Sequence, residues 1–134
     1  MATPSDERPG ATVLVVEDEP TLRRLLAYNL ERNGYRVLTA ADGEGALATA
    51  RGEAGRLDLV LLDLMLPGVD GLGVLARLRR DADVPVLILS AGDDERAQAA
   101  ALALGAAAYL VKPFALRELL DRVRAAVRRR PAAP

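Results

Sequence analysis

Side chains able to do chemistry follow apolar stretches at four places in the chain. Glu17 and Asp18 follow the first stretch, and Asp63 follows another. Ser90 and Lys112 follow two further stretches in the same way. Continuous apolar runs of this kind are typical of strands buried on both faces. Because the carboxyl ends of parallel strands meet at one edge of a sheet, we expect these side chains to lie together there.

The residue composition limits what such a site can do. The sequence contains no histidine and no cysteine, which excludes a Ser-His-Asp triad, a histidine base, imidazole or thiolate metal ligands and a disulfide framework. A metal held by the carboxylates must therefore be a hard ion with oxygen ligands, such as Mg²⁺. Lys112 is the only lysine beside 17 arginines, a weak indication that a compact point charge is needed at that place.

Length and net charge narrow the class of protein further. With 134 residues, of which 51% are hydrophobic, the chain is expected to form one domain with a core of Leu, Val and Ala. Its net charge of −1 gives no general attraction to nucleic acid or to a membrane surface. No apolar stretch approaches the length of a membrane span, and the polar first residues do not read as a signal peptide. We therefore expect a cytoplasmic protein that does not contact a membrane.

Apolar runs and amphipathic stretches alternate along the chain. Asn33-Gly34 and Gly105 are expected to end helices, and Pro67-Gly68 to turn the chain after a strand. Strands that alternate with helices predict an α/β fold, in which helices cover both faces of a parallel sheet. Residues 1–11 are expected to be a disordered tail, and 131–134 a linker or terminus. The predicted strands are 12–16, 35–40, 59–62, 84–89 and 107–111, and the predicted helices run from Pro20 to Asn33, about 43–52, 71–80, from Asp93-Asp94 to Gly105 and about 116–130.

The apolar stripes of the first and last helices predict which side chains face the core. Leucines of the first helix recur at the spacing of a helix with one buried face. The last helix shows the same pattern, and Phe114 and Leu119 have the spacing of a hydrophobic staple at its start. The predicted stripes are Leu22, Leu25, Leu26 and Leu30 in the first helix, and Leu116, Leu119, Leu120, Val123 and Val127 in the last.

The residues at the strand ends together suit a phosphoryl group. Two or three carboxylates at one edge repel one another unless a cation joins them, and Mg²⁺ takes one or two carboxylates while keeping several waters. The ammonium of Lys112 and the hydroxyl of Ser90, beside a metal-bound carboxylate, would suit a dianionic group with three oxygens. These groups predict a phosphoryl site, whose chemistry rests mostly on positioning and on neutralisation of charge.

The order of these motifs resembles the receiver domain of bacterial two-component response regulators, over about residues 12–130. The pattern is closest to CheY-like receivers of the winged-helix transcription-factor class. The resemblance implies a doubly wound (βα)5 fold, with a five-stranded parallel sheet in the flavodoxin-like order 2-1-3-4-5. It rests on the segments Val16-Glu17-Asp18-Glu19, Leu62 to Gly68 with Asp70-Gly71, Leu89-Ser90-Ala91 and Tyr109-Leu110-Val111-Lys112-Pro113-Phe114.

Carried over to this chain, the resemblance implies a phosphoacceptor and a metal site. Asp63 would accept a phosphoryl group from the histidine of a sensor kinase. Asp18 and Asp63 would bind Mg²⁺ directly, together with the backbone carbonyl of Met65. Glu17 would act on the same ion through a water molecule.

The resemblance also implies the parts of a switch. Lys112, Ser90 and Ala91 would contact the phosphoryl group, and the Lys112–Pro113 peptide bond would be cis. Phosphorylation would draw Ser90 inward and let Tyr109 turn into the vacated space, so that the face formed by the fourth helix, the fifth strand and the fifth helix changes. The chain would then be a signalling switch with at most slow self-dephosphorylation, rather than an enzyme.

The expected dimer face departs from the pattern of this class. Its receivers commonly carry charged residues on the fourth helix and around the fifth strand, whereas here the helix is rich in alanine and Ala107-Ala108 stand where acidic residues are usual. Four explanations stay open: a more apolar homodimer, another partner on this face, weak dimerisation, or a fourth helix that is well buried. DNA would be reached only through an output domain beyond Pro134. The candidate interface residues are Gln98, Leu102, Glu118, Arg122 and Arg129.

Other functions fit the same residues less well. A hydrolase that forms an aspartyl-phosphate commonly has a second Asp two positions after the nucleophile, where this chain has Met65, which cannot transfer protons. A flavin-binding module would be disfavoured by the charges of Glu17-Asp18-Glu19 at its phosphate loop. A degenerate receiver would have lost Asp63, Lys112 or an acidic partner, and all are present. Taken singly, the acidic pair, the serine and the tyrosine each have an ordinary structural role as an alternative.

Overall fold

Most of the chain is described by the structure, a computed structural model, and the gaps fall on several predictions from the sequence. Most of the tail predicted at 1–11, the turn predicted at Pro67-Gly68 and the linker predicted at 131–134 lie outside the described residues. The limits predicted for the domain, 12–130, therefore stay a prediction. The described residues are 10–53, 55–66, 70–92 and 94–129, the side chain of Arg129 excepted.

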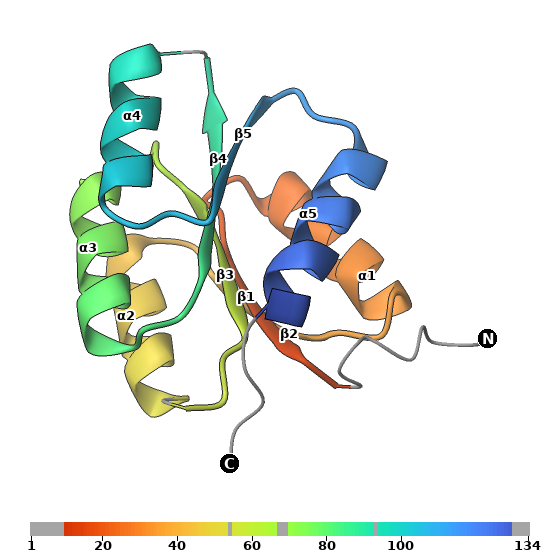
Figure 1. Cartoon of the computed structure of the whole chain (residues 1–134). Coiled ribbons are helices and arrows are strands. Elements are labelled where there is room, and N and C mark those ends of the chain that lie inside the picture. Colours follow the sequence, from red (N-terminus) through yellow and green to blue (C-terminus); the bar gives the residue numbers. More distant parts are fainter. Residues whose placement is uncertain (1–9, 54, 67–69, 93, 130–134) are drawn as a thin grey trace.

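A parallel sheet of five strands forms the middle layer of the fold (Figure 1). The strands are β1 (Thr12–Val16), β2 (Arg36–Ala40), β3 (Leu59–Asp63), β4 (Val86–Ala91) and β5 (Ala108–Lys112). Their order across the sheet is β2-β1-β3-β4-β5. This order confirms the doubly wound α/β fold and the flavodoxin-like arrangement that the resemblance implied.

Five helices cover the two faces of the sheet (Figure 1). They are α1 (Pro20–Arg32), α2 (Gly43–Gly52), α3 (Gly71–Asp81), α4 (Glu95–Ala103) and α5 (Leu116–Arg129). The core on one face is formed with α1 and α5, and the core on the other face with α2, α3 and α4. Among the described helices, none combines the length and the apolar character that a membrane crossing requires.

The central strands are buried along their whole length because both faces of the sheet are covered. Every residue of β1 and β3 is buried. Within β1, Leu14 and Val16 join the core on one face of the sheet, whereas Val13 and Val15 join the core on the other. Burial of such a side chain contributes about 1.5–3 kcal/mol relative to exposure. Two covered faces explain why these strands read as continuous apolar runs rather than as an alternating pattern.

The starts of the first four helices are fixed by acidic caps. The carboxylates of Glu19, Asp42, Asp70 and Asp94 accept hydrogen bonds from backbone N–H groups in the first turns of α1 to α4. These bonds satisfy donors that have no partner within the helix. Each cap follows the carboxyl end of a strand. The caps therefore fix where each helix begins at that edge of the sheet.

The fourth strand differs from its prediction by two residues at each end. The apolar run predicts 84–89, whereas β4 begins at Val86 and continues to Ala91. Backbone pairing explains the shift, since Val86 pairs with Val60 and Ala91 pairs with Lys112. The end of β5 is displaced by one residue for the same reason. Apolar character therefore located these strands, but the partners in the ladder set their ends.

Two residues predicted to face the core are exposed. Leu25 has 53% of its surface exposed and Leu116 has 38%, whereas Leu26 and Leu30 in the same stripe are buried. The predicted stripes are wrong at these two positions because the buried face of each helix is narrower than its apolar face. Both exposed leucines line an apolar hollow that also includes Lys112.

The helix α4 is largely exposed. Of its residues, all of which the structure describes, only Ala101 is buried. Leu102 is 46% exposed, and Gln98 is half-buried. The explanation in which the fourth helix is simply well buried is therefore wrong, while the three explanations that involve a partner or a weak dimer stay open.

Candidate functional site

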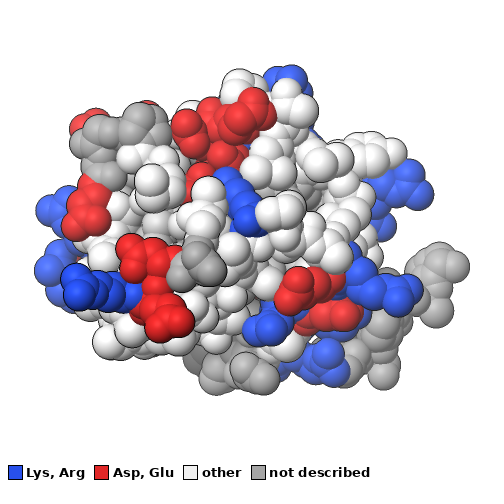
Figure 2. Space-filling model, turned by 90° about the horizontal axis from the view of Figure 1, so that it is seen from above, with Lys and Arg blue, Asp and Glu red and all other residues white. Residues whose placement is uncertain are grey.

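The predicted site residues lie at one edge of the sheet, where the strands end. Asp63 is the last residue of β3 and Lys112 the last residue of β5, while Glu17 and Asp18 follow β1 directly. Ser90 is the last residue but one of β4. Figure 2 shows the molecule from this edge, and acidic side chains gather there beside a basic one. These side chains therefore share the edge of the sheet at which their strands were predicted to end, while their roles stay a prediction.

The ammonium group of Lys112 joins two carboxylates that belong to different strands. Its Nζ donates hydrogen bonds to Oε1 of Glu17 at 2.9 Å and to Oδ2 of Asp63 at 3.1 Å. Glu17 is only 1% exposed and Asp63 only 3%. Charge-assisted hydrogen bonds are stronger where little water is present. Lys112 thus holds two buried like charges close together.

Backbone N–H groups hold the other oxygen of each buried carboxylate. The N–H of Glu19 donates to Oε2 of Glu17 at 3.1 Å, and the N–H of Met65 donates to Oδ1 of Asp63 at 2.9 Å. Each carboxylate therefore accepts one hydrogen bond from Lys112 and one from the loop that follows its own strand. This double attachment fixes the direction of both carboxylate groups.

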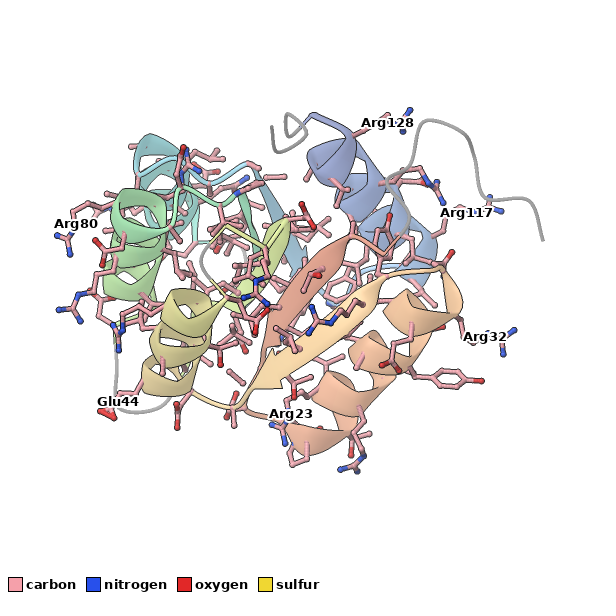
Figure 3. The ribbon with its side chains drawn as sticks, turned by 90° about the horizontal axis from the view of Figure 1, so that it is seen from below. Arg23, Arg32, Glu44, Arg80, Arg117 and Arg128 are labelled. Carbon is pink, nitrogen blue, oxygen red and sulfur yellow. The ribbon has the colours of Figure 1, made fainter. Side chains whose placement is uncertain are left out.

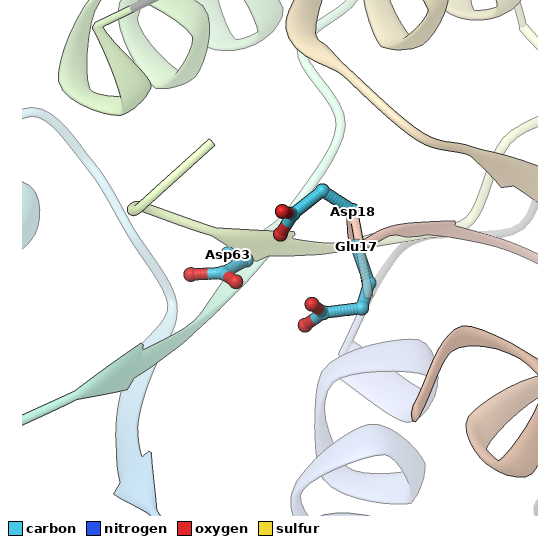
Figure 4. A group of neighbouring side chains, drawn as sticks. All are labelled: Glu17, Asp18 and Asp63. Carbon is cyan, nitrogen blue, oxygen red and sulfur yellow. The ribbon is translucent and has the colours of Figure 1, made fainter. Parts of the chain in front are cut away.

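Glu17, Asp18 and Asp63 form a group that can hold a metal ion (Figure 4). One carboxylate oxygen from each residue lies within 4.8 Å of the others. In Figure 4 the side chains of Glu17 and Asp18, beyond β1, approach the same space as the side chain of Asp63 on β3. Asp18 is exposed, so the group is open to water on one side. Carboxylate oxygens with access to water suit a hard divalent cation.

Burial and ion pairing change the pKa values of two groups in the site. Burial raises the pKa of Glu17, and the hydrogen bonds from Lys112 and from the N–H of Glu19 offset only part of this effect. Burial by itself would lower the pKa of Lys112, but its hydrogen bonds to Glu17 and Asp63 outweigh burial and raise it above its usual value. Lys112 is therefore charged at neutral pH, and Glu17 holds a proton more readily than an ordinary glutamate.

Arg23 of α1 contacts the backbone of the acidic turn that follows β1. Its Nη1 donates to the carbonyl oxygen of Glu17 at 2.8 Å and to that of Asp18 at 3.3 Å. In Figure 3, Arg32 and Arg80 extend away from the body of the molecule, whereas Arg23 lies on the first turns of α1. Neither this contact nor the ion pair between Lys112 and Glu17 was predicted from the sequence. An arginine one turn inside the helix that follows the acidic pair was the only available signal.

Ser90 and Tyr109 lie on the same face of the sheet. Tyr109 is paired with Ile88 in the ladder between β4 and β5, and Ser90 follows Ile88 by two residues, so the three side chains share a face. Ser90 is buried, and its hydroxyl donates to the carbonyl oxygen of Ala91 at a long 3.5 Å. Tyr109 is half-buried against the core formed with α2, α3 and α4.

The backbone around Lys112 combines a cis peptide bond, which the resemblance implied, with a strand pairing and a glycine turn. The peptide bond between Lys112 and Pro113 is cis. Ala91 pairs with Lys112 at the ends of β4 and β5, which places the loop after Ala91 beside the lysine. Gly92, the next residue, has a positive φ of 83°, a conformation that glycine adopts without steric cost.

The residues predicted for an interface lie on α4 and α5, on the two faces of the sheet beside β5 (Figure 1). Leu102, Glu118 and Arg122 are exposed, and Gln98 is half-buried. The side chain of Arg129 lies outside the described residues. The exposed residues are open to a partner, and an interface at this face stays a prediction.

An apolar hollow of about 330 Å³ adjoins the acidic site. Leucines of α1 form one wall, and the segment that leads from β5 into α5 forms the other. Because Lys112 takes part in both, the hollow and the acidic site share a wall. The lining residues are Leu22, Leu25, Leu26, Lys112, Pro113, Phe114 and Leu116.

Comparison with protein families identifies the class to which the chain belongs. The family model of the response regulator receiver domain matches residues 13–124. The chain therefore belongs to the receiver domain family of two-component response regulators, which are phosphorylation-activated switches. This result confirms the resemblance drawn from the four sequence segments.

Curated relatives of the chain are transcriptional regulators of about twice its length. It is 48% identical over 118 residues to the alkaline phosphatase synthesis transcriptional regulatory protein PhoP of Bacillus subtilis, which covers 87% of this chain and 48% of PhoP. It is 47% identical over 121 residues to the transcriptional regulatory protein KdpE of Mycobacterium tuberculosis, which covers 90% of this chain and 53% of KdpE. The chain thus spans about half the length of the curated relatives it matches.

Solved receiver structures have the same fold over nearly their full length. The BeF3-activated N-terminal receiver domain of Klebsiella pneumoniae RstA superposes with a TM-score of 0.81 at 32% identity, over 88% of this chain and 99% of that one. TrrA of Thermotoga maritima, in complex with Mg²⁺-BeF, superposes with a TM-score of 0.76 at 37% identity, over 87% of this chain and 98% of TrrA. A chain of the CheX-CheY-BeF3-Mg²⁺ complex of Borrelia burgdorferi superposes with a TM-score of 0.85 at 28% identity, over 92% of this chain and 97% of that one.

Proposed function

We propose that Asp63 is the phosphoacceptor of this receiver domain and that the histidine of a sensor kinase supplies the phosphoryl group. The observation that carries the proposal is the ammonium of Lys112, which is shared between Asp63 and Glu17. One oxygen of Asp63 is held by Lys112 and the other by the N–H of Met65. A nucleophile whose direction is fixed in this way suits an in-line displacement at phosphorus.

In the proposed transfer, one bond to phosphorus forms as another breaks. A carboxylate oxygen of Asp63 forms the new bond, and the bond between phosphorus and an imidazole nitrogen of the kinase breaks, leaving its electron pair on that nitrogen. An ammonium group has three N–H donors. Within the described residues Lys112 uses two of them, on Glu17 and Asp63, so the third can donate to a phosphoryl oxygen.

The proposal includes Mg²⁺ at the acidic group. Asp18, Asp63 and the backbone carbonyl of Met65 would be direct ligands, and Glu17 would act through water. A divalent cation supplies the positive charge that allows a dianionic phosphoryl group to approach three carboxylates. Two findings support this part: the three carboxylate oxygens within 4.8 Å of one another, and the Mg²⁺ named in the TrrA and CheX-CheY structures.

The response to phosphorylation is proposed to pass through Ser90 and Tyr109. The phosphoryl group would offer the hydroxyl of Ser90 a charged acceptor in place of its long bond to the carbonyl of Ala91. Tyr109 would then turn into the space that Ser90 leaves on the same face of the sheet. The face formed by α4, β5 and α5 would change with it, as a shift between two existing states.

The chain is proposed to act within a transcription regulator, because the PhoP and KdpE relatives carry that name and are about twice as long. An output domain would contact DNA, and the face formed by α4, β5 and α5 would control it or form a homodimer. Dephosphorylation within the chain itself is proposed to be slow, since the side chain of Met65 beside the acceptor cannot transfer a proton.

Intact mass after incubation with acetyl phosphate tests the proposal. We expect an adduct of one phosphoryl group on the parent chain in the presence of Mg²⁺, and none on Asp63→Asn. Asp70→Asn is the matched control, because Asp70 is an exposed acid seven positions away that caps α3, and it should be labelled like the parent. An adduct on Asp63→Asn would move the acceptor elsewhere, and failure of the parent to be labelled or to bind Mg²⁺ would overturn the proposal.

A further inference from the structure

The acidic turn after β1 is tied from α1 by a single side chain. Nη1 of Arg23 donates to the carbonyl oxygens of Glu17 and Asp18, at 2.8 and 3.3 Å. The backbone N–H of Arg23 also donates to the carbonyl oxygen of Glu19, at 2.9 Å. The side chain of Arg23 therefore holds two consecutive carbonyl groups of the turn, and the third is held by an ordinary backbone hydrogen bond of α1, which does not depend on the side chain.

This attachment matters most for Asp18. Glu17 and Asp63 have carboxylates held by hydrogen bonds, whereas in the described part of the chain no hydrogen bond to the carboxylate of Asp18 is present. Asp18 is also exposed. The position of the Asp18 carboxylate therefore depends on the path of the backbone. Arg23 holds that backbone through the carbonyl groups of Glu17 and Asp18.

We propose that Arg23 is a positioning residue for the cation and phosphoryl site. It holds the turn so that the carboxylate of Asp18 faces Asp63 before any ion binds. A guanidinium group suits this task, because it stays charged and presents several N–H donors in a rigid plane. The inference rests on the proposed function for its consequence, while the ordering of the turn can be measured in the metal-free chain.

A purely electrostatic role for Arg23 predicts the opposite change in Mg²⁺ affinity when the residue is removed. A positive charge close to the acidic group repels a divalent cation, so its removal alone would tighten Mg²⁺ binding. Positioning predicts weaker binding after removal, because the ligands must then be ordered when the ion binds. Arg23→Lys keeps the charge without the planar guanidinium, and Arg23→Ala removes both. Arg24→Ala is the matched control, since Arg24 is the exposed neighbour on the same helix.

The first measurement is amide hydrogen exchange of residues 17–19 in the metal-free chain, with EDTA present. We expect faster exchange in this turn for Arg23→Ala, intermediate exchange for Arg23→Lys, and no change for Arg24→Ala. Unchanged exchange in Arg23→Ala would overturn the inference, whether or not the chain binds Mg²⁺ or accepts a phosphoryl group.

The second measurement is the Kd for Mg²⁺ by calorimetry on the same variants. We expect Arg23→Ala to weaken binding on the order of tenfold, the size of one hydrogen bond to a charged group, with partial rescue in Arg23→Lys. An unchanged or tighter Kd in Arg23→Ala, in a parent that does bind Mg²⁺, overturns the inference and leaves the proposed function intact. A lower melting temperature with an unchanged Kd would likewise reduce Arg23 to a structural role.

Discussion

Lys112 and Asp63 lie 49 positions apart in the chain, yet Nζ of the lysine donates to Oδ2 of the aspartate at 3.1 Å. The two residues do not belong to neighbouring strands, since Asp63 pairs with Leu89 and Lys112 with Ala91. The contact therefore crosses the end of β4, which lies between them. The long, flexible stem of lysine spans this distance, and its compact ammonium reaches both carboxylates.

Replacement of Lys112 should slow the labelling of Asp63. We expect Lys112→Met to react with acetyl phosphate on the order of 100-fold more slowly, because one charged donor to the transferring group is lost. Lys112→Arg keeps the charge, but its planar fork does not serve two carboxylates and a phosphoryl oxygen at once, so an intermediate rate is expected. Initial rates by intact mass provide the measurement, with melting curves to verify folding. Labelling of Lys112→Met at the parent rate would contradict the assigned role.

The raised pKa of Glu17 should make the stability of the metal-free chain depend on pH. Between 4.5, the usual value, and the raised pKa, the folded chain binds more protons than the unfolded chain. The stability contributed by Glu17 is therefore fully present below 4.5 and decreases as the pH rises through that window.

Glu17→Gln isolates this contribution. The difference in unfolding free energy between the parent and Glu17→Gln, measured with urea in EDTA, should fall as the pH rises through the window and then level off. Addition of Mg²⁺ should offset the fall, because it binds the ionised group in the folded state. If the difference in unfolding free energy stays constant with pH, burial does not raise the pKa of Glu17.

Gly71 should tolerate no side chain. A Cβ at this position would meet the backbone of Leu64, with its oxygen nearest and its Cα at 2.7 Å, and a backbone cannot move aside as a side chain can. We expect Gly71→Ala to cost about 1–3 kcal/mol in stability. It should also slow labelling, because Leu64 follows the acceptor directly.

Gly73, on the same helix, is the control for Gly71. A Cβ there would meet only Asp70, at an ordinary 3.8 Å, so Gly73→Ala should stabilise α3 by about 0.5–1 kcal/mol. Urea unfolding of both variants gives the comparison. Equal effects of the two substitutions would mean that helix propensity, rather than the contact with Leu64, decides the outcome.

Two exposed leucines should separate contact with a kinase from self-association. Leu25 lines the apolar hollow that shares Lys112 with the site, whereas Leu102 lies on the exposed face of α4. We expect Leu25→Glu to reduce transfer from a sensor kinase while labelling by acetyl phosphate is unchanged. We expect phosphorylation to produce a homodimer through the face formed by α4, β5 and α5, and Leu102→Glu should prevent this dimer in gel filtration while it leaves both labelling reactions unchanged. Reduced kinase transfer in Leu102→Glu with unchanged transfer in Leu25→Glu would contradict the expectation that a sensor kinase contacts the hollow.

The sequence predicts the fold well because the central strands are covered on both faces. β1 and β3 are buried throughout, so their apolar runs are continuous and end where the polar site begins. The prediction fails where burial is partial. Leu25 and Leu116 continue apolar stripes, but they line a hollow at the surface, and the spacing of residues along a helix does not show how wide its buried face is.

The members of the site are predictable from the strand ends, whereas their contacts are not. Each strand end in a parallel sheet comes to the same edge, and this fixed the set of residues in advance. The bond from Lys112 to Glu17 crosses 95 positions and depends on the length and rotation of a side chain. The contacts of Arg23 are made with carbonyl groups, which leave no trace in residue type.

The solitary lysine gives the site a chemical handle. Reagents that acylate primary amines can react in this sequence only at Lys112 and at the chain's amino terminus. Such reagents attack the uncharged amine, and the two ion pairs of Lys112 favour the charged form, so slow acylation is the expected starting state. The acylation rate of Lys112 therefore reports on the site: any event that takes Glu17 or Asp63 away from the ammonium changes the extent of acylation in one peptide of a digest.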